Sequence, residues 1–361
     1  MRRALPSIFS VVVALVLSFI AAALTLGDLG QAGSAYLAMF QGAIGDWPRF
    51  FETGIPAAVM RPLGEAATKA ALLTLTGLSV AVAFRVGLFN IGAQGQMVVG
   101  AIAAAFIGAN VELPSALHVT LALLASALLG CAWALIATAL KLWRGVHEVI
   151  STIMLNWVAV SLVENWLVVG PLKATASGTN SLSGTAQIHP TAELPRLIPE
   201  ASRLNAGFFL AVGLALLVAL WMQRTRAGYE ARAVGLAPRA AEAAGINVSR
   251  RLFEAMAVSG ALAGLAGGVL ILGTELKYPA TLASPYGFDG IAIALIGQSH
   301  PLGALASALV FGALRAGGTH MQLYGVHKSF PELIQGLALL LVAAKLFWER
   351  LLARRTREVA P

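Results

Sequence analysis

Charged residues are scarce in this sequence. Lys, Arg, Asp and Glu make up 12% of its 361 residues, whereas a soluble domain carries about a quarter. Five stretches lack charge altogether, and each is close to the roughly 20 residues that a helix needs to cross a bilayer. A soluble enzyme and a disordered chain are therefore excluded. The uncharged stretches are residues 8–26, 86–111, 116–140, 204–223 and 255–274.

Cysteine occurs once and catalytic motifs do not occur. Because Cys131 has no partner in the chain, a disulfide scaffold is excluded. The sequence has no phosphate-binding loop, CxxC, HExxH or GxSxG motif, and its six histidines are not spaced as metal ligands. We therefore predict no catalytic residues, no metal and no cofactor. The net charge of +8 lies mostly in short connecting loops, so it indicates membrane orientation and no nucleic-acid partner.

The apolar segments predict an all-α fold, a polytopic transmembrane helical bundle of about 10 spans that forms one domain over residues 1–361. We interpret the first segment as a retained helix, because its 19 uncharged residues exceed the core of a secretory signal. The ten segments are residues 8–26, 63–84, 86–107, 116–140, 149–169, 204–223, 252–273, 288–298, 301–314 and 332–347.

The eighth and ninth segments are short and form a broken region at residues 288–303. Pro301 removes a backbone donor and disfavours helix at His300. The sequence leaves open whether residues 288–298 cross fully or re-enter as a hairpin. With ten crossings and the N-terminus inside, 16 of the 25 basic residues fall on the inner side, as the positive-inside rule favours. This arrangement predicts a multi-pass protein with both termini in the cytoplasm.

Amide side chains interrupt two of the apolar segments. Asn90, Gln94 and Gln96 follow one another closely in the third, and Thr152 and Asn156, four residues apart, share one face of the fifth. Polar groups at membrane depth need partners, which are either neighbouring helices or a hydrated path. We therefore regard these five residues as candidates for lining a translocation path, with hydrogen bonding between helices as the alternative.

Acidic residues are few in the spans, and most of them are predicted to lie in a first turn, near a membrane surface. Asp289 and Glu332 are of this kind. Glu164 lies further along its span, and we interpret it as an interfacial residue whose carboxylate reaches the membrane surface. An ion-coupled transporter normally places charged groups at mid-membrane, so this class is disfavoured.

Small residues recur at every fourth position in the seventh span. Gly260, Gly264 and Gly268 share one helix face, which allows another helix backbone to approach closely. Ala304, Ala308 and Gly312 repeat the pattern in the ninth span. We predict close packing inside the chain, with a subunit interface as the alternative.

The loop between the sixth and seventh spans, residues 224–251, is longer than a turn requires. Pro238 suits the first turn of a helix and Gly245 suits its end, so residues 238–244 predict a helix of about two turns, roughly 10 Å long. Arg239 and Glu242 are available for contact. Docking of a cytoplasmic partner is the functional interpretation, and a basic loop lying on anionic lipid is the alternative.

Four motifs carry a resemblance to a known family. They are G-L-F-N-I-G-A-Q-G-Q (87–96), H-E-V-I-S-T-I-M-L-N (147–156), F-D-G-I-A-I-A-L-I-G with P-L-G (288–303) and R-A-V-G-L-A-P-R-A-A-E-A-A-G-I-N (232–247). The first three resemble permease subunits of bacterial ABC importers, in the branch that handles nucleosides and simple sugars. The fourth resembles that family's coupling loop, which docks on the ATPase. The likeness covers residues 63 to 347.

This resemblance implies a transport subunit and no enzyme. ATP hydrolysis would reside on a separate ABC ATPase subunit, and an extracytoplasmic substrate-binding protein would deliver a small-molecule solute. A second permease, the same or a related chain, would complete the path in the bacterial inner membrane. Nucleosides are the expected solute, simple sugars the alternative, and an ion-coupled secondary transporter a different class. The residues implied in transmitting motion from the ATPase are Gly235, Pro238, Arg239, Glu242, Gly245 and Asn247.

Overall fold

The computed structural model describes residues 5–174, 184–198, 202–282, 285–327 and 329–344. Two helices continue into π-helical turns, at Ser161–Leu167 and Ile271–Glu275. The α-helices in this part of the chain are α1 (Leu5–Leu26), α2 (Leu29–Ile44), α3 (Trp47–Thr53), α4 (Ala57–Arg85), α5 (Ala93–Asn110), α6 (Ser115–Arg144), α7 (Glu148–Val160), α8 (Gly207–Arg224), α9 (Arg226–Leu236), α10 (Pro238–Ala243), α11 (Val248–Leu270), α12 (Tyr286–Ile296), α13 (Pro301–Met321) and α14 (Phe330–Ala343).

The predicted all-α membrane bundle is confirmed, although the count of ten spans was loose. Within the described residues, α1, α4, α6, α7, α8, α11 and α13 are long and apolar enough to cross a membrane, the π-helical turns included. The other three predicted segments differ from plain spans. Residues 86–92 are not helical and α5 starts only at Ala93, while α12 and α14 have 11 and 14 residues.

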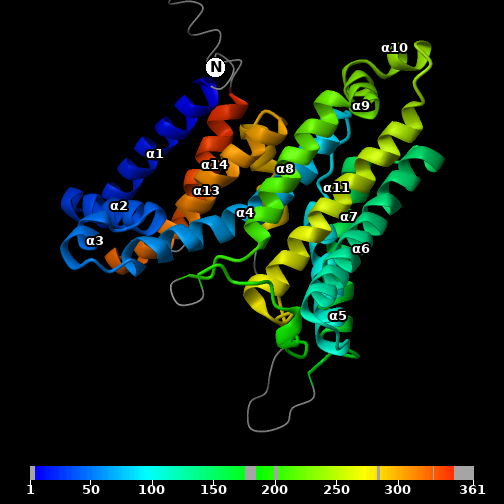
Figure 1. Cartoon of the computed structure of the whole chain (residues 1–361). Helices are drawn as coiled ribbons and strands as arrows, with labels where there is room; N and C mark the ends of the chain where they lie inside the picture. Colours follow the sequence, from blue (N-terminus) through cyan, green and yellow to red (C-terminus); the bar gives the residue numbers. More distant parts are fainter. Residues whose placement is uncertain (1–4, 175–183, 199–201, 283–284, 328, 345–361) are drawn as a thin grey trace, which may run out of the picture.

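The two ends of the bundle differ in what they carry. Figure 1 shows the start of α1, the end of α14 and the pair α9–α10 at one end, which we call the α10 end. α3 and the loop that follows α5 lie at the opposite end, which we call the α3 end. The described parts nearest the two termini therefore lie at the same end as the predicted docking loop.

The broken region near residues 288–303 consists of a half-helix, a tight turn and a returning helix. α12 measures about 16 Å, half of the roughly 30 Å hydrocarbon core. Gln298 and Ser299 in the turn adopt left-handed backbone conformations, with φ of 56° and 52°, which are strained for residues other than glycine. The turn contacts the last residues of α4 and α8, so it lies at the α10 end.

The segment between the first two predicted spans is mostly helical. Residues 27–61 contain α2 and α3 and the start of α4. α2 packs against α13, because Met39 is fully buried and an added Cβ on Gly317 of α13 would overlap its carbonyl oxygen. α3 begins with Trp47 and exposes aromatic side chains, which are typical of a membrane interface.

α4 and α11 form the centre of the bundle. In their most apolar windows 83% and 78% of the residues are buried, against 22% in α1 and in α6. The predicted small-residue faces make this possible. A Cβ on Gly264 would overlap the carbonyl oxygen of Ser126 in α6, and one on Gly312 would lie 2.6 Å from the backbone nitrogen of Ala70 in α4. These glycines therefore allow close packing of helices within the chain.

Replacing Gly264 with alanine is expected to lower the free energy of unfolding by about 1–3 kcal/mol, because the added methyl group pushes two backbones apart. Gly213→Ala in α8 is the matched control, since its methyl group meets no atom within 4 Å and alanine restricts the unfolded chain. Thermal melting in detergent measures both variants. Equal melting temperatures would contradict the close crossing of α6 and α11.

Candidate functional site

The chain between α4 and α5 enters the interior without forming a helix. Gly87 adopts a φ of 81°, a conformation that favours glycine. Leu88 and Asn90 are buried, with exposed fractions of 2% and 0%. Non-helical backbone at membrane depth is tolerated only where protein or water satisfies its polar groups. The side chains that form hydrogen bonds with the backbone of residues 86–92 therefore define the site.

Asn90 is the centre of a buried hydrogen-bond network. Its Nδ2 donates to Gln96 Oε1 at 2.9 Å and to Ser259 Oγ of α11 at 2.8 Å. Its Oδ1 accepts from the Gly92 backbone N–H at 2.9 Å and from Gln96 Nε2 at 3.0 Å. Ser259 Oγ also donates to the Ser79 carbonyl oxygen of α4 at 2.7 Å. The network therefore joins α4, α5 and α11.

Asn156 and Gln94 tie two further helices to the same place. Asn156 of α7 accepts from the Gly95 N–H at 2.8 Å, and its Nδ2 donates to the Ile91 carbonyl oxygen at 2.8 Å. It thus serves both a free N–H in the first turn of α5 and the irregular chain before it. Gln94 Oε1 accepts from the Gly287 N–H at 2.8 Å, which fixes the first turn of α12.

Thr152 completes the group of five predicted residues. Its Oγ1 donates to the Glu148 carbonyl oxygen at 2.7 Å, and its Cβ would lie 3.1 Å from a Cβ added to Gly92. All five side chains thus gather around the first turn of α5, with exposed fractions between 0% and 6%. The four amides form hydrogen bonds between helices and to the irregular chain, whereas Thr152 donates within α7. Lining of a path by the same residues stays a prediction.

Asn156→Ala is expected to cost about 2 kcal/mol of stability, because the Gly95 N–H and the Ile91 carbonyl lose their partners in a buried place. Asn165→Ala, on the exposed side of the π-helical turn that follows α7, is the control. Its amide makes one long hydrogen bond of 3.5 Å, so we expect a change within about 0.5 kcal/mol. Melting curves in detergent compare the two, and an equal loss would contradict the capping role.

The loop 224–251 is mostly helical. α10 (Pro238–Ala243) matches the predicted helix to one residue, and Gly245 follows it with a φ of 82°. Arg239 and Glu242 are exposed on α10, and Asn247 caps α11 by accepting from the Arg250 N–H at 2.9 Å. The 11-residue α9 was not predicted. We call α9 and α10 together the α9–α10 arm.

The α9–α10 arm touches the bundle through Gly235. A Cβ there would overlap the carbonyl oxygen of Arg85, the last residue of α4, and Gly87 lies close on the other side. Arg85 Nε in turn donates to the Ser299 carbonyl oxygen at 2.8 Å. The arm therefore contacts the start of residues 86–92 directly and reaches the turn between α12 and α13 through one side chain.

His300 lies in the same turn, beside the end of α8. Its Nε2 lies 3.0 Å from Gln223 Nε2, and its Nδ1 accepts from the Leu302 N–H at 3.2 Å at the start of α13. Burial, and then the nearby charge of Arg85, lower the pKa of His300 below its ordinary value. The imidazole is therefore neutral at physiological pH, which its acceptor role at Nδ1 requires.

A charged cluster lies where the sequence placed none. Arg315 Nη1 of α13 is 2.5 Å from Asp289 Oδ2 of α12, and both side chains are 13% exposed. Gln335 of α14 donates to Asp289 Oδ1 at 3.0 Å, Lys69 Nζ of α4 donates to the Arg315 carbonyl oxygen at 3.1 Å, and Glu332 Oε1 is 3.6 Å from Arg315. Four helices meet at this cluster.

Asp289 lies in the first turn of α12, as predicted, but it is buried against Arg315 and not near a membrane surface. The predicted ninth span ends at residue 314. In the structure α13 continues to Met321, so Arg315 lies within the helix and inside the bundle. A signal was present, because a lone Arg inside a long apolar helix needs an acidic partner. α12, which the turn at 297–300 joins to α13, supplies this partner as Asp289.

The interpretation of Glu164 as an interfacial residue was also wrong. Its side chain is 8% exposed, and its Oε1 accepts from the Leu282 N–H at 2.8 Å and from the Tyr278 hydroxyl at 3.2 Å. Burial and this carboxylate raise the pKa of Tyr278, which therefore stays a hydrogen-bond donor. The π-helical turn Ser161–Leu167 carries Glu164, and such turns shift side chains off the regular helix face. Glu164 thus holds the chain that leads toward α12.

Acidic, histidine and cysteine side chains do not converge on a metal site. Within the described residues no three of them lie close enough to hold an ion. The candidate site instead presents amide, hydroxyl and backbone groups. Such groups exchange hydrogen bonds with neutral polar molecules as readily as with helices.

The chain belongs to the family described as the branched-chain amino acid transport system / permease component, which matches residues 63–343. It is therefore a multi-pass membrane protein of an ABC transport family. The matched residues include the five polar residues around the first turn of α5, which we call the amide cluster. They also include the α9–α10 arm and the charged cluster.

Three relatives share much of the chain. A guanosine ABC transporter permease protein of Bacillus subtilis is 34% identical over 92% of this chain and 92% of its own. A glucose ABC transporter permease protein of Haloferax volcanii is 33% identical over 80% and 77%. A nucleoside ABC transporter permease protein of Lactococcus lactis is 32% identical over 81% and 82%. No solved structure matches the chain.

Proposed function

We propose that this chain is the membrane-spanning permease subunit of an ATP-driven ABC importer for nucleosides. The observation that carries the proposal is the 34% identity to the guanosine permease over 92% of both chains. The fold supports it, since a helical bundle carries an exposed rigid arm at one end and buried amides near its centre. Residues 1–361 form one transmembrane domain, and residues 224–251 are its cytoplasmic coupling loop.

Transport begins at the α9–α10 arm. ATP hydrolysis on a separate ABC ATPase subunit pushes on Pro238, Arg239 and Glu242 at the exposed surface. Gly245 and Asn247 anchor the far side of the arm to α11, so that the push is delivered at Gly235. Residues 86–92 and the turn at 297–300 then move, because Gly235 and Arg85 contact both.

The moving segments control the amide cluster. Asn90 and Asn156 form hydrogen bonds with the backbone of residues 86–92. Gln94 accepts a hydrogen bond from the first turn of α12. When these segments separate, the amides of Asn90, Gln94, Gln96 and Asn156 and the hydroxyl of Thr152 exchange internal partners for the solute. A nucleoside carries sugar hydroxyls and base edges that match such neutral donors and acceptors.

Partners complete the importer. A second permease, the same or a related chain, forms the other wall of the path, and an extracytoplasmic substrate-binding protein delivers the solute. The excess of basic residues near the α10 end supports a cytoplasmic location for that end and for both termini, in a bacterial cell whose inner membrane holds the protein. The α3 end then faces outward.

Simple sugars are the second candidate solute. The glucose permease of Haloferax volcanii is 33% identical to this chain, nearly as similar as the guanosine permease. Amide-lined paths suit sugar hydroxyls too, so the site chemistry alone does not separate the two classes of solute. Competition for uptake does separate them.

Uptake into proteoliposomes tests the proposal. The complete complex of permeases, ATPase and binding protein should accumulate labelled guanosine when ATP is supplied, and unlabelled nucleosides should compete whereas glucose should not. Competition by glucose alone would transfer the proposal to sugars. Guanosine accumulation by the permease alone, driven by an ion gradient, would replace it with an ion-coupled transporter.

A further inference from the structure

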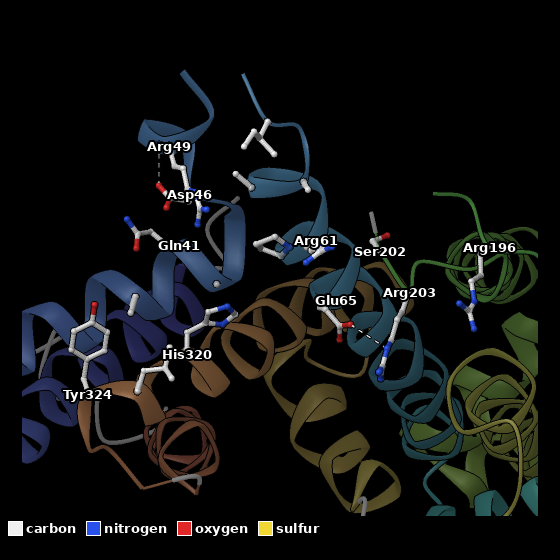
Figure 2. A pocket seen from close by; sticks show the side chains of 17 residues that line it. Gln41, Asp46, Arg49, Arg61, Glu65, Arg196, Ser202, Arg203, His320 and Tyr324 are labelled. Carbon is white, nitrogen blue, oxygen red and sulfur yellow. Dashed lines mark hydrogen bonds and ion pairs between the residues drawn. The ribbon is translucent and has the colours of Figure 1, made fainter. Parts of the chain in front are cut away.

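A large cavity opens at the α3 end, away from the amide cluster. Its volume is about 840 Å³, and it is bounded by α2, α3, the start of α4, the end of α13 and the residues Arg196, Ser202 and Arg203. Figure 2 shows Arg61 between Arg49 on one side and Arg203 and Arg196 on the other. None of these four arginines takes part in the network at Asn90.

The cavity has an excess of positive charge. Of its two acidic side chains, Asp46 is engaged in capping α3 by accepting from the Arg49 N–H at 3.2 Å, and Glu65 is paired with Arg203 at 3.9 Å. Arg49, Arg61 and Arg196 form no ion pair with any acid among the described residues. Four guanidinium groups therefore line the cavity against two carboxylates, an excess of positive charge that favours an anion.

Exposed apolar side chains lie at and near the rim of the cavity. Leu323 and Ile55 line it with exposed fractions of 81% and 47%, and Phe51 of α3 is 77% exposed beside Trp47. α4 is 29 residues long, or about 43 Å, which exceeds the roughly 30 Å hydrocarbon core. Arg61, in its second turn, therefore reaches the layer of lipid headgroups, where Trp side chains concentrate.

We propose that this cavity binds the phosphodiester headgroup of an anionic phospholipid. The phosphate accepts hydrogen bonds from Arg49 and Arg61, since guanidinium groups match phosphate oxygens in pairs. The acyl chains lie along Phe51, Ile55 and Leu323, which otherwise face the surroundings of the bundle. A soluble anion would use the arginines and leave this apolar rim uncovered. The bound lipid joins α2, α3, α4 and α13, and the proposal does not depend on which solute is carried.

Native mass spectrometry of the purified full-length chain tests the proposal. The chain is released from mild detergent after titration with phosphatidylglycerol, or with phosphatidylcholine of the same acyl chains. We expect retention of phosphatidylglycerol in preference to phosphatidylcholine. Arg49→Gln/Arg61→Gln should weaken it about 30-fold, since each basic group near an anionic headgroup contributes roughly a fivefold factor. Arg144→Gln/Arg224→Gln, which removes two exposed arginines near the α10 end, is the matched control and should change nothing.

Several outcomes would overturn the proposal. Equal retention of both lipids would remove the charge argument, and complete displacement by glycerol phosphate would assign the cavity to a free phosphate. If Arg49→Gln/Arg61→Gln kept the lipid and instead lost its complex with the substrate-binding protein, the cavity would belong to an acidic protein surface. Because both substitutions are at exposed positions, we expect the variant to fold, and its melting temperature in lipid-free detergent checks this.

Discussion

Arg315→Met is expected to be the most destabilising of the substitutions considered for the folded protein, lowering the free energy of unfolding by about 3–5 kcal/mol. Among the described residues, the change leaves the buried Asp289 carboxylate with the Gln335 amide as its one hydrogen-bond partner. A buried charge without a counter-charge is costly because the protein interior solvates it poorly. Thermal melting of the detergent-solubilised chain measures the loss.

Two further variants make this expectation specific to the buried pair. Arg315→Met/Asp289→Asn should recover most of the lost stability, since neither member of the buried pair is then charged and Asn still accepts from Gln335. Arg250→Met breaks the pair of Arg250 and Glu254, whose side chains are 68% and 34% exposed, and should cost below about 1 kcal/mol. A double variant less stable than Arg315→Met would show that Asp289 is not the group left uncompensated.

Gly235→Ala is expected to reduce nucleoside uptake by about tenfold or more while the complex continues to hydrolyse ATP. The added methyl group overlaps the Arg85 carbonyl oxygen, so the arm must move away from α4. Such overpacking costs about 1–3 kcal/mol in the arrangement that transmits movement, and 1.4 kcal/mol corresponds to tenfold. Uptake and phosphate release, measured in the same proteoliposomes, separate lost coupling from lost ATPase binding.

Gly213→Ala serves as the control for this experiment too, because it adds the same methyl group to α8 in open space. Its uptake should equal that of the unmodified protein. Parallel loss of uptake and ATP hydrolysis in Gly235→Ala would mean that the arm fails to dock. Normal uptake would show that the contact between Gly235 and Arg85 transmits nothing.

Helix location was predictable from the sequence because local signals determine it. Uncharged runs mark the spans, and Pro238 with Gly245 brackets α10 to within one residue. The glycines at every fourth position of α11 correctly indicated a close helix crossing. Each of these features depends on neighbours within a few turns of the same helix, so no knowledge of the tertiary arrangement is needed.

The contacts of the polar residues were not predictable, because they join segments far apart in the chain. Asn90 bonds to Ser259 and Gln94 to Gly287, across 169 and 193 residues. The pairing of Arg315 with Asp289 needed the true end of α13, and the burial of Glu164 needed the π-helical turn. The five amide and hydroxyl residues were identified as a group, but that they surround the first turn of α5 follows only from the packing.

The central position of α4 has a consequence for biosynthesis. Its Ser79 meets Ser259 of α11, and its Ala70 faces Gly312 of α13, residues that leave the ribosome long after α4 has entered the membrane. Until then the newly made α4 exposes its hydroxyl groups to acyl chains. Maturation of the core must therefore await the last third of the polypeptide, and a truncated product ending after α8 is an expected target for membrane proteases.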